Sequence, residues 1–120
     1  MPSYVAPLNA DQLLHTAQSE HLYGALINQL QKDFNLANQH LTLPQNSSPQ
    51  QVKDLIHESV FLLISNRFTD YLNLLYIIDV PENEVRLLDG TDMVRLSEQV
   101  TFLILKRSWQ KVWFKHNYNA

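Results

Sequence analysis

The sequence predicts an all-α protein, a helical bundle of three long helices and one short helix. Only two of its 120 residues are glycine, too few for the many tight turns of an all-β fold. Apolar residues recur at helical spacing along three long stretches of the chain. Prolines and short polar segments separate these stretches. The length predicts one helical domain covering residues 1–120.

The first long helix is expected from Asn9 to about Asn38. Residues 1–8, which include two prolines, are predicted to form a flexible arm before it. Asn9 with Gln12 three residues later matches a capping box, the signature of a helix start. Apolar residues fall on one side of this helix, namely Leu13, Ala17, Tyr23, Gly24, Leu26, Ile27, Leu30 and Phe34.

The second long helix is expected from Pro49 to about Ile78. Residues 40–48 are rich in turn formers and are predicted to be a linker loop. Ser48, Pro49 and Gln51 then form a second capping box, and Pro81 forces the helix to end. Its main apolar arc comprises Ile56, Val60, Leu63, Ile64, Phe68, Tyr71, Leu74, Leu75 and Ile78. A second stripe, roughly opposite, comprises Leu55, Leu62, Leu72 and Tyr76.

A short helix is expected over residues 82–88, and a last long helix from Thr91 or Asp92 to about His116. The runs Val100–Leu105 and Leu74–Val80 also suit strands on propensity alone, but their flanks keep a helical period. The last helix again has two apolar stripes. The first comprises Met93, Leu96, Val100, Leu103 and Ile104, and the second comprises Val94, Phe102, Leu105, Trp109, Val112 and Trp113.

Helices that are apolar on two sides are either central in a bundle or buried again by a partner. We therefore expect a homodimer, with the alternative that the tail folds back over the second stripe of a single domain. The two tryptophans fit either the core or the dimer contact. The predicted interface comprises Leu62, Leu72, Tyr76, Phe102, Leu105, Trp109 and Trp113.

Three charged residues interrupt the apolar arcs, which points to an ion pair or a ligand site. Glu20 falls on the inner arc of the first helix, Arg67 on that of the second, and Arg107 on a stripe of the last. A charge that faces a core must be paired, so Glu20 is predicted to pair with Arg67 or Arg107. The alternatives are exposure at a rim, or a pocket for an anion or small molecule built from Glu20, Arg67, Arg107 and Tyr71.

The charge of the chain is divided unevenly. Residues 106–120 carry Lys106, Arg107, Lys111 and Lys115 and no acid, whereas residues 1–105 carry five Lys or Arg and all twelve Asp or Glu. This basic segment also includes both tryptophans. Its positive charges either interact favourably with the dipole at a helix C-terminus or contact a nucleic acid or an acidic partner. The net charge of −3 argues against nucleic-acid binding.

Several chemistries lack their usual residues. The chain has no cysteine, and its two isolated glycines cannot form a phosphate-binding loop. Asp54 and His57 have a spacing found in helical metal sites, but no second such pair accompanies them. We expect no cofactor, no metal and no catalytic residue. The chain also lacks a signal peptide and a long apolar run, which predicts a cytoplasmic protein without a membrane partner.

Two strings in the second half of the chain, residues 71–82 (YLNLLYIIDVPE) and 103–107 (LILKR), resemble a group of small helical bacterial proteins without an assigned activity. The resemblance implies a compact helical domain in the bacterial cytosol and transfers no site residue. The sequence thus favours an interaction or scaffold module, of otherwise unknown function, that forms a helical homodimer. The alternatives are a helical protein that binds a small molecule or anion, and weak nucleic-acid binding through the basic last helix.

Overall fold

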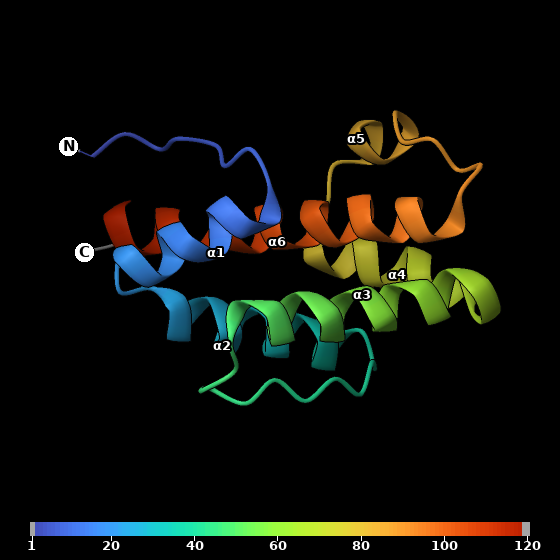
Figure 1. Ribbon diagram of the computed structural model, residues 1–120, viewed down its shortest axis with the longest axis horizontal. Helices are drawn as coiled ribbons and strands as arrows, with labels where there is room; N and C mark the ends of the chain where they lie inside the picture. The colour runs from blue at the N-terminus through green and yellow to red at the C-terminus, as the bar shows by residue number, and fades with distance from the viewer. Residues whose placement is uncertain (1, 119–120) are drawn as a thin grey trace.

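The computed structural model describes residues 2–118, which form six helices and no strand (Figure 1). In chain order they are α1 (Ala10–Ser19), α2 (Tyr23–Leu36), α3 (Pro49–Asn66), α4 (Phe68–Ile78), α5 (Glu82–Arg86) and α6 (Met93–Tyr118). Helix α6 runs along the length of the molecule and contacts each of the other five. The all-α class is confirmed. The arrangement of three long helices is not found, because the first two are each divided.

The first predicted helix breaks between α1 and α2. His21 adopts a left-handed backbone conformation with φ of 59°, and the Leu22 N–H donates to the Ala17 carbonyl at 2.8 Å. This is the hydrogen bond of a Schellman helix end, for which glycine is the usual residue at the left-handed position. Leu22 is buried directly after the turn. The chain can therefore leave the line of α1 and continue as α2 below it (Figure 1).

The left-handed residue at this break predicts opposite effects for two glycine substitutions. We expect His21→Gly to raise the free energy of unfolding by up to about 1 kcal/mol, because glycine has no steric penalty at positive φ. His15→Gly, at an exposed position inside α1, should lower it by about 1 kcal/mol. Urea denaturation of both variants tests this, and equal destabilisation by the two would contradict the left-handed turn.

The second predicted helix breaks at Arg67, between α3 and α4. The backbone of Arg67 leaves the helical region, with φ of −144° and ψ of 63°. A continuous helix would turn the Arg67 guanidinium toward the apolar arc of Val60, Ile64 and Tyr71, where an unpaired charge is costly. At the break the Arg67 side chain is 66% exposed and forms an ion pair with Asp70 at 2.6 Å.

The predicted helix starts are confirmed. Ser48 and Gln51 form both hydrogen bonds of a capping box. At Asn9 only half of the predicted box is formed: the Asn9 side chain accepts from the Gln12 N–H at 2.8 Å, but the Gln12 side chain accepts from the Leu8 N–H instead of the Asn9 N–H. Asp92 caps α6 by accepting from the Val94 and Arg95 amides. Local side-chain chemistry therefore sets three helix starts without help from tertiary packing.

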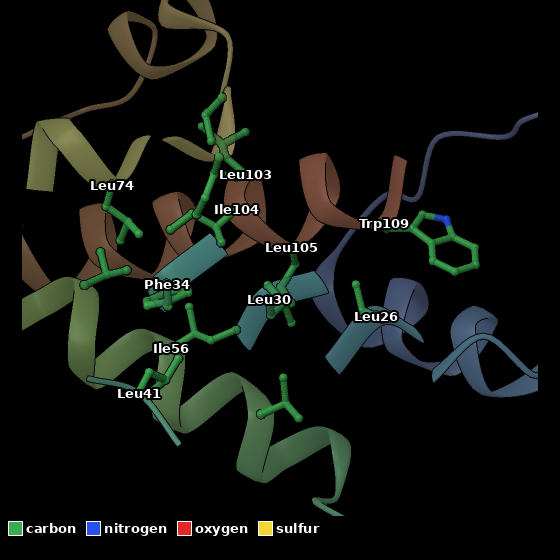
Figure 2. Close-up of a cluster of buried hydrophobic side chains, with 14 of the residues drawn as sticks. Leu26, Leu30, Phe34, Leu41, Ile56, Leu74, Leu103, Ile104, Leu105 and Trp109 are labelled. Atoms are coloured by element: carbon green, nitrogen blue, oxygen red, sulfur yellow. The ribbon is translucent and has the colours of Figure 1, made fainter. Parts of the chain in front are cut away.

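One hydrophobic core joins α1, α2, α3, α4 and α6. Figure 2 shows side chains of α2, α3 and α4, together with Leu41 from the loop after α2, gathered against those of α6. Both apolar stripes of α6 contribute, because helices surround it. Leu105 and Trp109 are as deeply buried as Ile104.

The arm and the linker are both fastened to the helices. The Tyr4 ring lies 5.3 Å from the Trp113 ring, and Pro7 is buried, so the arm predicted to be flexible covers the second stripe near the end of α6. In the linker, the Gln31 amide donates to the Leu41 carbonyl and accepts from the Leu43 N–H. Leu41 and Leu43 are thereby buried in the core.

Candidate functional site

The predicted ligand-binding residues do not come together. Glu20 is exposed at the end of α1 and makes no ion pair within residues 2–118, so its predicted pairing with Arg67 or Arg107 is wrong. The Arg107 guanidinium instead donates to the Asp79 carbonyl at 3.0 Å and to the Asp79 carboxylate at 3.1 Å. Tyr71 is buried among apolar side chains, and this burial raises the pKa of its phenol.

Two of the charges that interrupt the apolar arcs lie at helix breaks. Glu20 directly precedes the left-handed His21, and Arg67 is itself the residue between α3 and α4. In both places the end of the helix moves the charged side chain out of the arc to which a continuous helix would assign it. A lone charge on an otherwise apolar arc is therefore a sequence signal of a helix break at these two positions, and not of the predicted ion pair.

The predicted interface is divided between core and surface. Leu105, Trp109 and Trp113 are buried inside the protomer, which corrects their assignment to an intermolecular contact in favour of the core alternative. Phe102 is half-buried against the same core. Leu62, Leu72 and Tyr76 remain exposed on α3 and α4. The part of the predicted interface that is accessible thus lies on these two helices.

Helix α4 presents an apolar stripe to solvent, formed by Phe68, Leu72 and Tyr76. These residues follow each other at intervals of four and are 56%, 51% and 80% exposed. Large apolar side chains aligned on an exposed helix face are typical of protein contact sites. The sequence predicts Phe68 on the inner arc, whereas in the structure it is the first residue of α4 after the break at Arg67 and is exposed.

The exposed face of α4 also lacks charge. Thr69 and Asn73 flank the stripe and are exposed, and Asp70 is the only charged residue within α4. Asp70 is already paired with Arg67 at the start of the helix. Leu62, 50% exposed near the end of α3, adds a further apolar side chain close in sequence. Depletion of charge and enrichment of aromatic residues distinguish interface cores from ordinary surface.

The four residues of the predicted basic patch do not form one free cationic surface. Lys106 pairs with Glu84 at 3.1 Å, Arg107 with Asp79 at 3.1 Å, and Lys111 with Asp33 at 2.8 Å. Lys115 is exposed at the end of α6. Three of the four charges therefore hold α5, α4 and α2 against α6, and these pairings weaken the case for nucleic-acid binding.

His57 on α3 contacts Ser97 on α6, with 2.7 Å between Nε2 and Oγ. The Ser97 hydroxyl donates to the Val94 carbonyl at 2.8 Å, so the histidine N–H is the donor in their contact. Ser97 is buried, and its oxygen accepts from the histidine rather than giving it a proton. The pair therefore links two helices. No group of three acids or histidines that could hold a metal ion occurs among residues 2–118.

None of the helices within the described part of the chain combines the length and apolarity that crossing a bilayer requires. Comparison with known proteins gives no family model, curated protein or solved structure that matches this chain.

Proposed function

We propose that this protein is a helical interaction module that self-associates as a homodimer through the exposed stripe of α4. The observation that carries the proposal is the alignment of Phe68, Leu72 and Tyr76 on an uncharged helix face. Burial of such side chains stabilises an interface by about 25 cal/mol for each Å² removed from water. Exposure of this stripe to water gives no stabilisation, whereas its burial in an interface does.

A second copy of the chain is the partner that this face suits best. A stripe without charge is complementary to another uncharged surface, because a charged partner would lose hydration without gaining an ion pair. Packing α4 against its symmetry mate about a twofold axis would satisfy this, since each stripe then covers the other. The stripe from Phe68 to Tyr76 is about 12 Å long, so it would form the centre of an interface completed by the end of α3, including Leu62.

The solution mass tests the proposal. Sedimentation equilibrium between about 1 and about 100 µM should give twice the monomer mass of 14.0 kDa at the upper concentrations. Leu72→Glu should restore the monomer mass at every concentration in this range, because it places a charge in a desolvated contact. The substituted residue is exposed in the protomer, so the helical circular dichroism spectrum should not change.

Leu87→Glu is the matched control. It makes the same change at a residue that is also exposed but lies beyond α5, away from α4, and its mass should equal that of the wild-type protein. A monomeric wild-type protein at about 100 µM would contradict self-association. A dimer that survives Leu72→Glu but dissociates in Leu87→Glu would move the interface away from α4.

A further inference from the structure

A cleft of about 510 Å³ lies between α2 and the C-terminal part of α6. Leu22, Ala25 and Val112 form the apolar part of its lining. The amides of Asn28 and Gln29 and the cationic or titratable groups of Lys32, Lys115 and His116 form the polar part. This volume falls within the usual range for small-molecule sites, which combine apolar walls with a few polar groups.

Among the described residues, the lining of this cleft includes two lysines and no acid. Four further clefts on the described part of the chain each include at least one carboxylate in their lining, namely Glu20, Asp54, Asp11 or Glu98. The protein as a whole carries a net charge of −3. An acid-free concentration of positive charge is therefore a local feature, opposite in sign to the rest of the molecule.

The lysines of this cleft are also distinguished by their lack of counter-ions. Six of the nine Lys and Arg residues form ion pairs within residues 2–118, and Lys32, Arg95 and Lys115 do not. Two of these three unpaired residues line the same cleft. Their mutual repulsion would be relieved by an anion bound between them.

The acid nearest in sequence is already engaged. Asp33, which follows Lys32 on α2, is buried and accepts from Lys111 at 2.8 Å and from Gln29 at 3.1 Å. Lys111 thereby neutralises the carboxylate beside the cleft, and the Gln29 side chain is held in place at its edge. Lys32 and Lys115 have no ion pair among residues 2–118, so they can face a ligand from outside the chain.

We infer that this cleft binds a small organic anion. A phosphate or carboxylate group would be held by Lys32 and Lys115, with hydrogen bonds from the His116 ring and from the amides. An apolar portion of the same ligand would contact Leu22, Ala25 and Val112. None of these residues lies on α4, so the site is separate from the surface proposed for self-association.

Phenyl phosphate, benzoate and inorganic phosphate are suitable probes, because they separate the anionic group from the apolar portion. Titration of the protein followed by amide nuclear magnetic resonance should give saturable shifts at residues 22–32 and 112–116 with phenyl phosphate or benzoate. Whichever of these two probes binds more tightly identifies the preferred anionic group, phosphate or carboxylate. Inorganic phosphate should bind at least about tenfold more weakly than phenyl phosphate, since it cannot use the apolar lining.

Lys32→Gln and Lys115→Gln should each weaken binding of the tighter probe by about three- to tenfold, because each removes one charge-assisted contact. Arg95→Gln removes the same charge from the third unpaired basic residue, which lies outside the cleft, and should leave binding unchanged. If Arg95→Gln weakened binding as much as the two lysine variants, the loss of affinity would reflect only the change in net charge, and the proposed site would be overturned. Equal affinity for phenyl phosphate and inorganic phosphate would overturn the assigned ligand class. A hexaglutamate peptide serves as a further probe, and the ligand class would also be overturned if this peptide bound more tightly than phenyl phosphate and benzoate. Absence of any amide shift at about 10 mM of every probe would overturn both the site and the ligand class.

Discussion

Replacement of Trp109 by alanine should lower the free energy of unfolding by about 3 to 5 kcal/mol, the range for truncation of a large buried aromatic side chain. Trp109 is 1% exposed and lies in the middle of α6, the helix that contacts all the others. The substitution removes its apolar contacts and leaves a cavity that the surrounding helices fill only in part. Because a domain of this kind is stable by only about 5 to 15 kcal/mol, the variant should be close to unfolding.

Urea denaturation followed by circular dichroism measures this change without depending on tryptophan fluorescence. Phe114→Ala is the control, because Phe114 is an aromatic residue of the same helix that is 40% exposed. Its truncation should cost clearly less than that of Trp109, about 1 kcal/mol. If Trp109→Ala kept the wild-type stability but altered the solution mass, Trp109 would belong to an intermolecular contact after all.

The second large effect is expected at the ion pair between α2 and α6. Asp33 is 4% exposed, and its carboxylate depends on Lys111 at 2.8 Å and on Gln29. Lys111→Met should lower the free energy of unfolding by about 2 to 3 kcal/mol, because it leaves a buried carboxylate with a single neutral donor. The Lys111 side chain is itself 23% exposed, so the cost should stay below that of a fully buried pair.

The double variant Asp33→Leu with Lys111→Met should recover most of this loss and lie within about 1 kcal/mol of the wild-type protein. Such recovery would show that the penalty comes from the orphaned charge, and a double-mutant cycle measures the coupling. Lys53→Met is the control, since it breaks the exposed pair with Asp11 and should cost less than about 1 kcal/mol. A cost for Lys111→Met no larger than that of the control would contradict the importance of this pair.

The features that the sequence predicts correctly are those that local chemistry decides. The caps at Asn9, Ser48 and Asp92 depend on hydrogen bonds that span only two or three residues, so they can be recognised without knowledge of the fold. The end of α4 near Pro81 has an equally local cause. The all-α class follows from the same signals together with the helical period of the apolar residues.

The breaks at His21 and Arg67 escaped the same reasoning. Neither residue is glycine or proline, and the apolar spacing continues across both positions almost without a shift. The left-handed turn at His21 carries a steric cost, which is met by packing of Leu22 and the helices after it. Because this compensation comes from residues distant in the sequence, a local pattern does not reveal it.

The exposed stripe of α4 is predicted only in part, because the sequence pattern does not reveal the break that precedes it. Leu72 and Tyr76 were correctly separated from the inner arc, since their spacing puts them opposite it within α4. Phe68 is predicted to be buried, whereas it is the first residue of α4 after the break and is exposed there. Trp109 and Trp113 belong to a genuine second stripe, but the stripe is covered by the protein's own α1 and N-terminal arm rather than by a partner.

The amino-acid pattern alone accounts for the helical class, the positions where helices start and the identity of most core residues, because capping and amphipathic spacing act over a few residues. Tertiary packing decided where two long helices break, which apolar stripe stays exposed, and which acid each lysine meets. These outcomes depend on contacts between segments far apart in the chain, such as Asp33 with Lys111 and Tyr4 with Trp113. The exposed stripe of α4 and the cleft lined by Lys32 and Lys115 likewise depend on how the helices pack, so both become visible only in the folded molecule.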